Sequence, residues 1–160
     1  MTTPHRHAAF TLIELLVVLA VMGLLAAITV PVAEVSVQRS RETDLRIALR
    51  EIRTAIDAHK KAYDDGRMVK TTDATGYPKS LAVLAEGVED AADPKKRKMY
   101  FLRRVPRDPM NPDASLDDAE TWGKRAYESE PGEPKEGKDV YDVFSRSTRT
   151  GLNGVPYSRW

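Results

Sequence analysis

The sequence contains no cysteine and only three histidines among its 160 residues. Without cysteine the chain can form no disulfide and perform no thiol chemistry. His5 and His7 lie near the N-terminus, which leaves His59 for the rest of the chain. That supply supports neither a histidine-based catalytic triad nor a zinc site of histidine and cysteine ligands, and no glycine-rich phosphate loop is present. We therefore expect a protein that is not an enzyme, in which His59 is a surface or packing residue.

The sequence also lacks an excess of charge of either sign, because it has 25 Lys and Arg residues and 24 Asp and Glu residues, which gives a net charge of +1. Such a balance gives no general reason to expect nucleic acid as a partner. One basic cluster stands out beside Tyr100 and Phe101, and its members are Lys95, Lys96, Arg97, Lys98, Arg103, Arg104 and Arg107. We interpret this basic cluster either as a solvated surface or as a contact with acidic residues of a neighbouring subunit, namely Asp113, Asp117, Asp118 or Glu120.

Charge is nearly absent from residues 10–33, where Glu14 is the only charged side chain. A helix of ~20 apolar residues can cross a bilayer, and it satisfies its own backbone groups in lipid. The sequence therefore predicts a single membrane-spanning helix at residues 10–33, after a polar leader at residues 1–9. A carboxylate at membrane depth costs about 2.5–3.5 kcal/mol and usually marks a function. We expect Glu14 to pair with a cation inside an assembly.

A cleaved secretory signal is the competing interpretation of this segment. The apolar part of such a signal is usually ~7–15 residues long and ends at an Ala-x-Ala site. The apolar run here is longer, and Leu24, Leu25 and Pro31 stand two residues before the candidate alanines at positions 26, 27 and 33. This pattern favours a retained membrane helix.

The helical pattern continues past the apolar run into residues 34–66. Apolar side chains recur there at three- and four-residue steps, which is typical of an amphipathic helix. They are Leu45, Ala48, Leu49, Ile52, Ala55, Ile56, Ala62 and Tyr63. Gly66 marks the expected end of the helix, and Pro31 is expected to kink it without ending it.

The remaining residues, 67–160, predict a small globular domain. We expect a short helix over residues 81–87, strands near residues 124–128 and 140–145 that form a hairpin, and a terminal loop held to the domain by Tyr157 and Trp160. The predicted fold class is α+β, with a long N-terminal transmembrane and amphipathic helix packed on a small C-terminal antiparallel sheet.

Residues 10–14 read Phe-Thr-Leu-Ile-Glu after a short basic leader, and this stretch resembles the processing site of type IV pilin-like proteins. The resemblance implies that a prepilin peptidase cuts between Ala9 and Phe10 and methylates the new amino group of Phe10. It also implies that Glu14 attracts the amino terminus of the adjacent subunit. Ala9 departs from the glycine that most relatives carry before the cut.

Four later landmarks are similar in order to the major pseudopilin of type II secretion systems. They are Tyr77-Pro78, residues 100–102 together with 105–109, Trp122-Gly123 and residues 139–143. This resemblance implies a homo-oligomeric filament in the periplasm, built from subunits held in the inner membrane with the leader in the cytoplasm. Its implied partners are membrane lipid, minor pseudopilins and the inner-membrane assembly platform. A type IV pilus or minor pilin subunit, or a monomeric membrane-anchored binding module, remains an alternative.

The chain departs from that pseudopilin pattern at two places. Residues 110–121 separate the Asp-Pro landmark from Trp122-Gly123, which commonly follow each other almost at once in the family. The family also commonly holds calcium in an acidic loop after the last strand, but residues 145–160 contain no Asp or Glu. Asn153 offers one neutral oxygen there, so a calcium site near Asn153 remains open and is not our expectation.

Overall fold

The computed structural model describes residues 11–71 and 73–160, without the side chains of residues 28–31. The predicted leader and the cleavage site at Ala9 and Phe10 therefore lie outside the described residues. The same holds for the side chain of Pro31, so the kink at this residue stays a prediction. The chain divides into two compact units, Met1–Arg39 and Ser40–Trp160.

One long helix, α1 (Leu12–Asp64), contributes to both units. Thr11 precedes its first turn, and its hydroxyl oxygen accepts the backbone N–H of Glu14 at 3.3 Å, as an N-cap residue does. At the other end Gly66 has a φ of 76°, while the N–H groups of Gly66 and Arg67 donate to the carbonyls of Tyr63 and Ala62. This Schellman arrangement ends the helix at the glycine that the sequence indicated.

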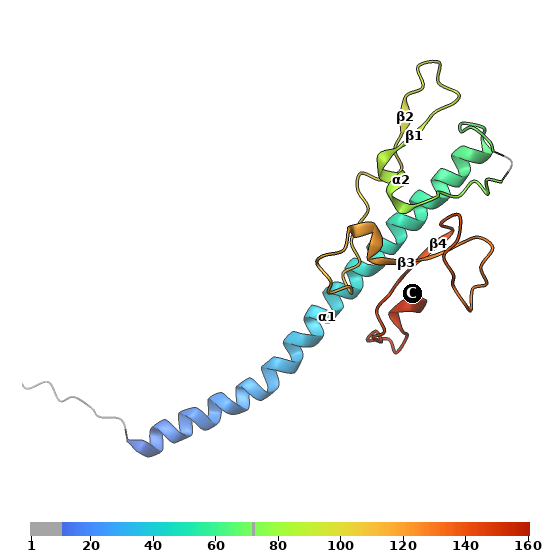
Figure 1. The fold of residues 1–160 in the computed structure, drawn as a ribbon. Coiled ribbons are helices and arrows are strands. Elements are labelled where there is room, and N and C mark those ends of the chain that lie inside the picture. Colours follow the sequence, from blue (N-terminus) through green and yellow to red (C-terminus); the bar gives the residue numbers. More distant parts are fainter. Residues whose placement is uncertain (1–10, 72) are drawn as a thin grey trace, which may run out of the picture. The chain divides into compact units, whose positions relative to one another are not determined.

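The second unit has its hydrophobic core against one face of α1. The predicted apolar stripe is confirmed, because its side chains from Leu45 to Ala62 are buried and Tyr63 is half-buried. The side chains that pack on this stripe include Leu81, Leu84, Trp122, Val143 and Tyr157. Figure 1 shows these later segments gathered along the second half of α1.

The elements that cover α1 are short. Helix α2 (Leu81–Glu86) ends at Gly87, as expected, and strands β3 (Trp122–Arg125) and β4 (Asp142–Ser145) form the predicted antiparallel hairpin. The predicted start of β3 was late, because the chain turns after Arg125 and Ala126 donates its N–H to the carbonyl of Lys135. The α+β fold class is confirmed.

Two elements were not anticipated from the sequence. The sequence predicted no strand between residues 88 and 99, but β1 (Val88–Glu89) and β2 (Lys98–Met99) pair there in a second antiparallel hairpin. The C-terminal stretch was expected to be a loop, but it contains a Thr150–Pro156 bridge and the 3₁₀-helix η2 (Tyr157–Arg159). Both elements are too short to leave a periodic pattern in the sequence.

Candidate functional site

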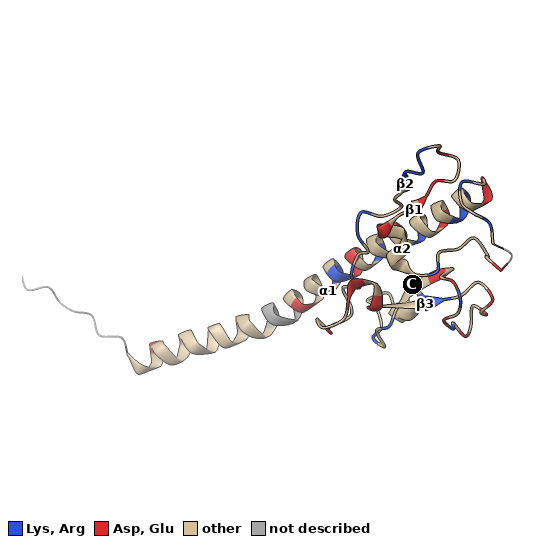
Figure 2. Ribbon diagram, turned by 45° about the horizontal axis from the view of Figure 1, so that its top comes forward, with Lys and Arg blue, Asp and Glu red and all other residues tan. Residues whose placement is uncertain are grey.

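The first part of α1 is an apolar surface without cover from its own chain. Its large side chains from Leu12 to Leu25 are all exposed, and within the described residues α1 is the one helix long and apolar enough to cross a membrane. Figure 2 shows this part of the helix almost without charged residues. An exposed apolar face of this length needs lipid or other helices around it.

Glu14 is placed in the first turn of this apolar helix. Its backbone is fixed by Thr11, whose carbonyl oxygen and hydroxyl lie 3.1 and 3.3 Å from the Glu14 nitrogen. Its carboxylate is exposed and, among the described residues, forms no ion pair. A carboxylate near a helix N-terminus is stabilised by the helix dipole, but an apolar surrounding favours a cationic partner as well.

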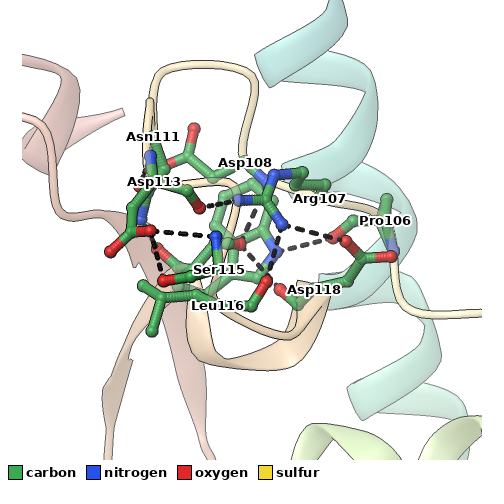
Figure 3. A network of polar contacts seen from close by, with 10 residues as sticks. Pro106, Arg107, Asp108, Asn111, Asp113, Ser115, Leu116 and Asp118 are labelled. Carbon is green, nitrogen blue, oxygen red and sulfur yellow. Dashed lines mark hydrogen bonds and ion pairs between the residues drawn. The ribbon is translucent and has the colours of Figure 1, made fainter.

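The basic cluster does not present all of its charges to a neighbour, because Arg107 is engaged inside its own chain (Figure 3). Its guanidinium donates to the carbonyl of Leu116 at 2.8 Å and to the carbonyl of Asp113, and it lies 3.4 Å from the carboxylate of Asp118. Arg107 therefore contacts the acidic loop of its own chain, and a contact of Arg107 with a neighbouring subunit stays a prediction.

Of the other residues in the basic cluster, some contact partners in their own chain and others are exposed to solvent. Arg97 pairs with Asp93 at 2.5 Å, and Lys98 donates to the carbonyl of Glu86 at 3.2 Å. Arg103 and Arg104 are exposed. We see here mainly a solvated surface with internal pairs, which is the first of the two interpretations offered by the sequence.

The insertion at residues 110–121 is built on two buried polar groups. Asp108 is fully buried, accepts the N–H of Met110 at 2.8 Å, and accepts the hydroxyl of Ser145 at 2.7 Å. Trp122 is also fully buried, and its indole N–H donates to the carbonyl of Pro106 at 2.7 Å. The Asp-Pro and Trp-Gly landmarks are thereby joined in space, although the insertion separates them in sequence.

His59 is a packing residue, as predicted. It is buried, its ring lies 5.3 Å from that of Phe101, and its Nδ1 lies 3.0 Å from the carbonyl oxygen of Gly76. Because a carbonyl can only accept, Nδ1 must carry the proton. Burial lowers the pKa of His59, and the hydrogen bond to Gly76 opposes this shift.

The C-terminal segment is held by two charged residues of α1. The carboxylate of Glu42 is buried and accepts the N–H of Leu152 at 2.8 Å and the hydroxyl of Tyr157 at 2.9 Å. Arg53 donates to Asp142 at 2.8 Å and to the carbonyls of Val143 and Trp160 at 3.0 and 2.9 Å. We call this pair the α1 clamp. The predicted tether by Tyr157 and Trp160 is confirmed, but its partners on α1 were missed.

The residues near Asn153 do not fit calcium. Calcium takes about six to eight oxygen ligands, usually with several carboxylates. The side-chain oxygen of Asn153 already accepts the N–H of Val155 at 3.0 Å, and the carboxylate that reaches this segment, Glu42, faces N–H and O–H donors. Within the described residues no group of three or more acidic or histidine side chains is arranged for a metal ion.

The comparisons with known proteins point to the N-terminal segment. A family model of the prokaryotic N-terminal methylation motif matches residues 4–30. This match covers the expected cleavage site, Glu14 and most of the apolar helix, and it supports a type IV pilin-like protein anchored in a membrane by a single helix. It also implies processing by a prepilin peptidase and pilin-type assembly in general. Neither the curated proteins nor the solved structures include a significant match to the chain.

Proposed function

We propose that this protein is the structural subunit of a periplasmic pseudopilus that drives type II secretion of folded proteins across the outer membrane. The observation that carries the proposal is the exposed apolar surface of the first part of α1, where Glu14 is the only charged residue in positions 10–33. This surface lies within a match to the N-terminal methylation motif. The later landmarks of the sequence favour the secretion system over a pilus.

In this proposal the peptidase removes residues 1–9 and methylates Phe10, and the subunit stays in the inner membrane through residues 10–33. Residues 34–66 and the globular domain at residues 67–160 project into the periplasm. Growth of the filament replaces lipid around α1 with the helices of like subunits. A contact between two different surfaces of like subunits does not close, so it generates a helical filament.

Glu14 gives that growth its direction. Its carboxylate attracts the methylated amino terminus of the adjacent subunit, and the pair becomes stronger as lipid and neighbouring helices exclude water. Removing one partner of such a desolvated pair costs about 2–5 kcal/mol. The exported proteins, the minor pseudopilins and the assembly platform are partners of the whole machine, and no nucleic acid is involved.

Substitution of Glu14 tests the proposal. We expect Glu14→Ala and Glu14→Gln to leave membrane insertion and processing at normal levels while removing most of the sheared filament fraction. The matched control is Glu34→Ala, because Glu34 is an exposed carboxylate of the same helix. Filaments of the Glu14→Ala protein at the normal level would contradict the proposed role, and so would a purified native chain that still begins at Met1.

Two further measurements separate the alternatives. Loss of secreted enzymes on deletion of the gene indicates the secretion system, whereas loss of surface fibres alone indicates a type IV pilus. Because the chain has no cysteine, single cysteines placed in α1 report contacts between like helices without background. A monomeric binding module predicts no such cross-link.

A further inference from the structure

A groove rich in arginine lies between α1 and the C-terminal segment. It has a volume of about 510 Å³, and four arginines and Asp57 account for its charged lining residues. We call it the arginine groove; its arginines are Arg46, Arg50, Arg53 and Arg159. Trp160 adds an aromatic wall. The positive charge of the groove therefore exceeds its negative charge, although the whole chain is nearly neutral.

Two of these arginines are engaged and two are free to bind. Arg53 belongs to the α1 clamp, and Arg46 places its guanidinium 4.2 Å from the centre of the Trp160 ring. Arg50 and Arg159 are exposed, and neither forms an ion pair within the part of the chain that the structure describes. Arg46 and Arg53 are thus held in place by their own chain, while the guanidinium groups of Arg50 and Arg159 have no carboxylate partner in residues 11–71 and 73–160. Such a groove can bind the carboxylates of an acidic segment.

The same chain carries, on another surface, an acidic segment whose charge is opposite to that of the groove. The acidic turn is formed by residues 117–120, around the 3₁₀-helix η1 (Asp118–Glu120). Thr121 donates its hydroxyl to the carbonyl of Asp118 at 2.6 Å, and Arg107 fixes the preceding loop (Figure 3). Asp117 and Glu120 are left exposed, and among the described residues they form no ion pair.

The acidic loop at residues 128–136 is less suitable, because three of its four carboxylates are already matched locally. Glu128 pairs with Lys138 at 2.7 Å, and Glu136 pairs with Arg146 at 2.9 Å. Glu133 lies 3.2 Å from Lys135. An incoming arginine would have to displace these partners, whereas it would meet Asp117 and Glu120 unopposed.

We propose that the acidic turn of one copy docks in the arginine groove of a second copy of this chain. The inference rests on the proposed filament and names a contact between its globular domains. The two surfaces differ and do not overlap, since the groove is not lined by the acidic turn, so each copy can use both at once. Charges across such a contact set the register between subunits more than they add affinity.

Charge exchange tests the contact. We expect the double variant Arg50→Glu, Arg159→Glu to lower the yield of filaments about tenfold, because like charges then face each other across the contact. The double variant Asp117→Lys, Glu120→Lys is expected to do the same, and the combination of all four substitutions to restore assembly. Arg104→Glu is the control, since Arg104 is exposed and lies outside the groove. Normal assembly of the groove variant, or failure of the combined variant to recover, would overturn the contact.

Cross-linking separates this inference from the proposed function. We would express two single-cysteine chains in one cell, one with Arg50→Cys and the other with Glu120→Cys. The control is a second cell that expresses the Arg104→Cys and Glu120→Cys chains. The inference requires a disulfide-linked dimer from the first pair and not from the second. Filaments that form normally without this dimer would overturn the docking alone, whereas an unsubstituted chain that forms no filament would overturn both proposals.

Discussion

Glu42 and Tyr157 share a hydrogen bond of 2.9 Å across 115 positions of sequence, and this bond fastens the end of the chain to the middle of α1. The same carboxylate oxygen accepts the N–H of Leu152 at 2.8 Å. A buried carboxylate with two donors thus holds the segment where the resemblance to pseudopilins would place calcium. Side chains of α1 therefore hold this segment.

Removing the Glu42 carboxylate should therefore destabilise the domain. We expect Glu42→Ala to lower the free energy of unfolding by about 1–3 kcal/mol, since the Tyr157 hydroxyl and the Leu152 N–H lose their acceptor. Glu42→Gln should cost less because its amide oxygen can accept the same bonds. Thermal unfolding of the full chain in detergent measures the effect. Neither calcium nor a chelator should shift the midpoint, and a clear rise with calcium would contradict the clamp.

Gly123 should not tolerate a side chain. It lies opposite Phe144 in the β3–β4 hairpin, and a Cβ atom at Gly123 would overlap the Phe144 ring. Because Trp122 and Val143 of this hairpin belong to the hydrophobic core, we expect Gly123→Ala to cost about 1–3 kcal/mol in unfolding free energy. Gly132→Ala is the control, since nothing lies within 4 Å of the added Cβ atom there. Equal stability of the two variants, measured by urea unfolding, would show that Phe144 can move aside.

His59 should make the domain sensitive to mild acid. Burial lowers its pKa from the ordinary value of 6.5, so the folded state favours the neutral ring more than the unfolded state does. Its contribution to stability is then fully present above pH 6.5 and is lost as the pH falls through the lowered pKa. The slope from this group cannot exceed about 1.4 kcal/mol per pH unit.

The measurement is the unfolding free energy of the chain and of His59→Gln between pH 7.5 and pH 5, a range set around the ordinary pKa of histidine, which is about 6.5. Glutamine can still donate to the carbonyl of Gly76 but does not titrate. We expect the difference between the two proteins to shrink as the pH falls. A difference that stays constant would mean that His59 keeps an ordinary pKa in the fold.

The two hairpins show which strands can be predicted from the sequence and which cannot. The pairing of β3 with β4 was predicted from two strand-like stretches separated by a loop rich in proline and glycine. The start of β3 was not predicted correctly, because it depends on the bond from Ala126 to Lys135. The β1–β2 hairpin was missed because two-residue strands carry no alternation to detect.

The burial and the partners of the charged residues were also not predictable from the sequence. Glu42 and Arg53 lie among other charged residues on a helix, and a periodic pattern places such residues toward water. Only the packed structure shows that Glu42 is buried and that Arg53 reaches β4 and Trp160. For Arg107 the sequence allowed a solvated surface or a contact with a neighbouring subunit. It did not reveal the turn that brings the acidic loop of its own chain close to Arg107.

The sequence by itself determined the features that depend on neighbours along the chain: the apolar run with Glu14, the processing motif, the buried stripe of α1 and its end at Gly66. Helix formation and insertion into lipid follow from local spacing and composition, so these features can be read without coordinates. The tertiary structure decided which charges face inward. It also decided how the C-terminal segment is held and where unpaired arginines gather in a groove. Those outcomes depend on contacts between residues far apart in sequence, which local patterns do not encode.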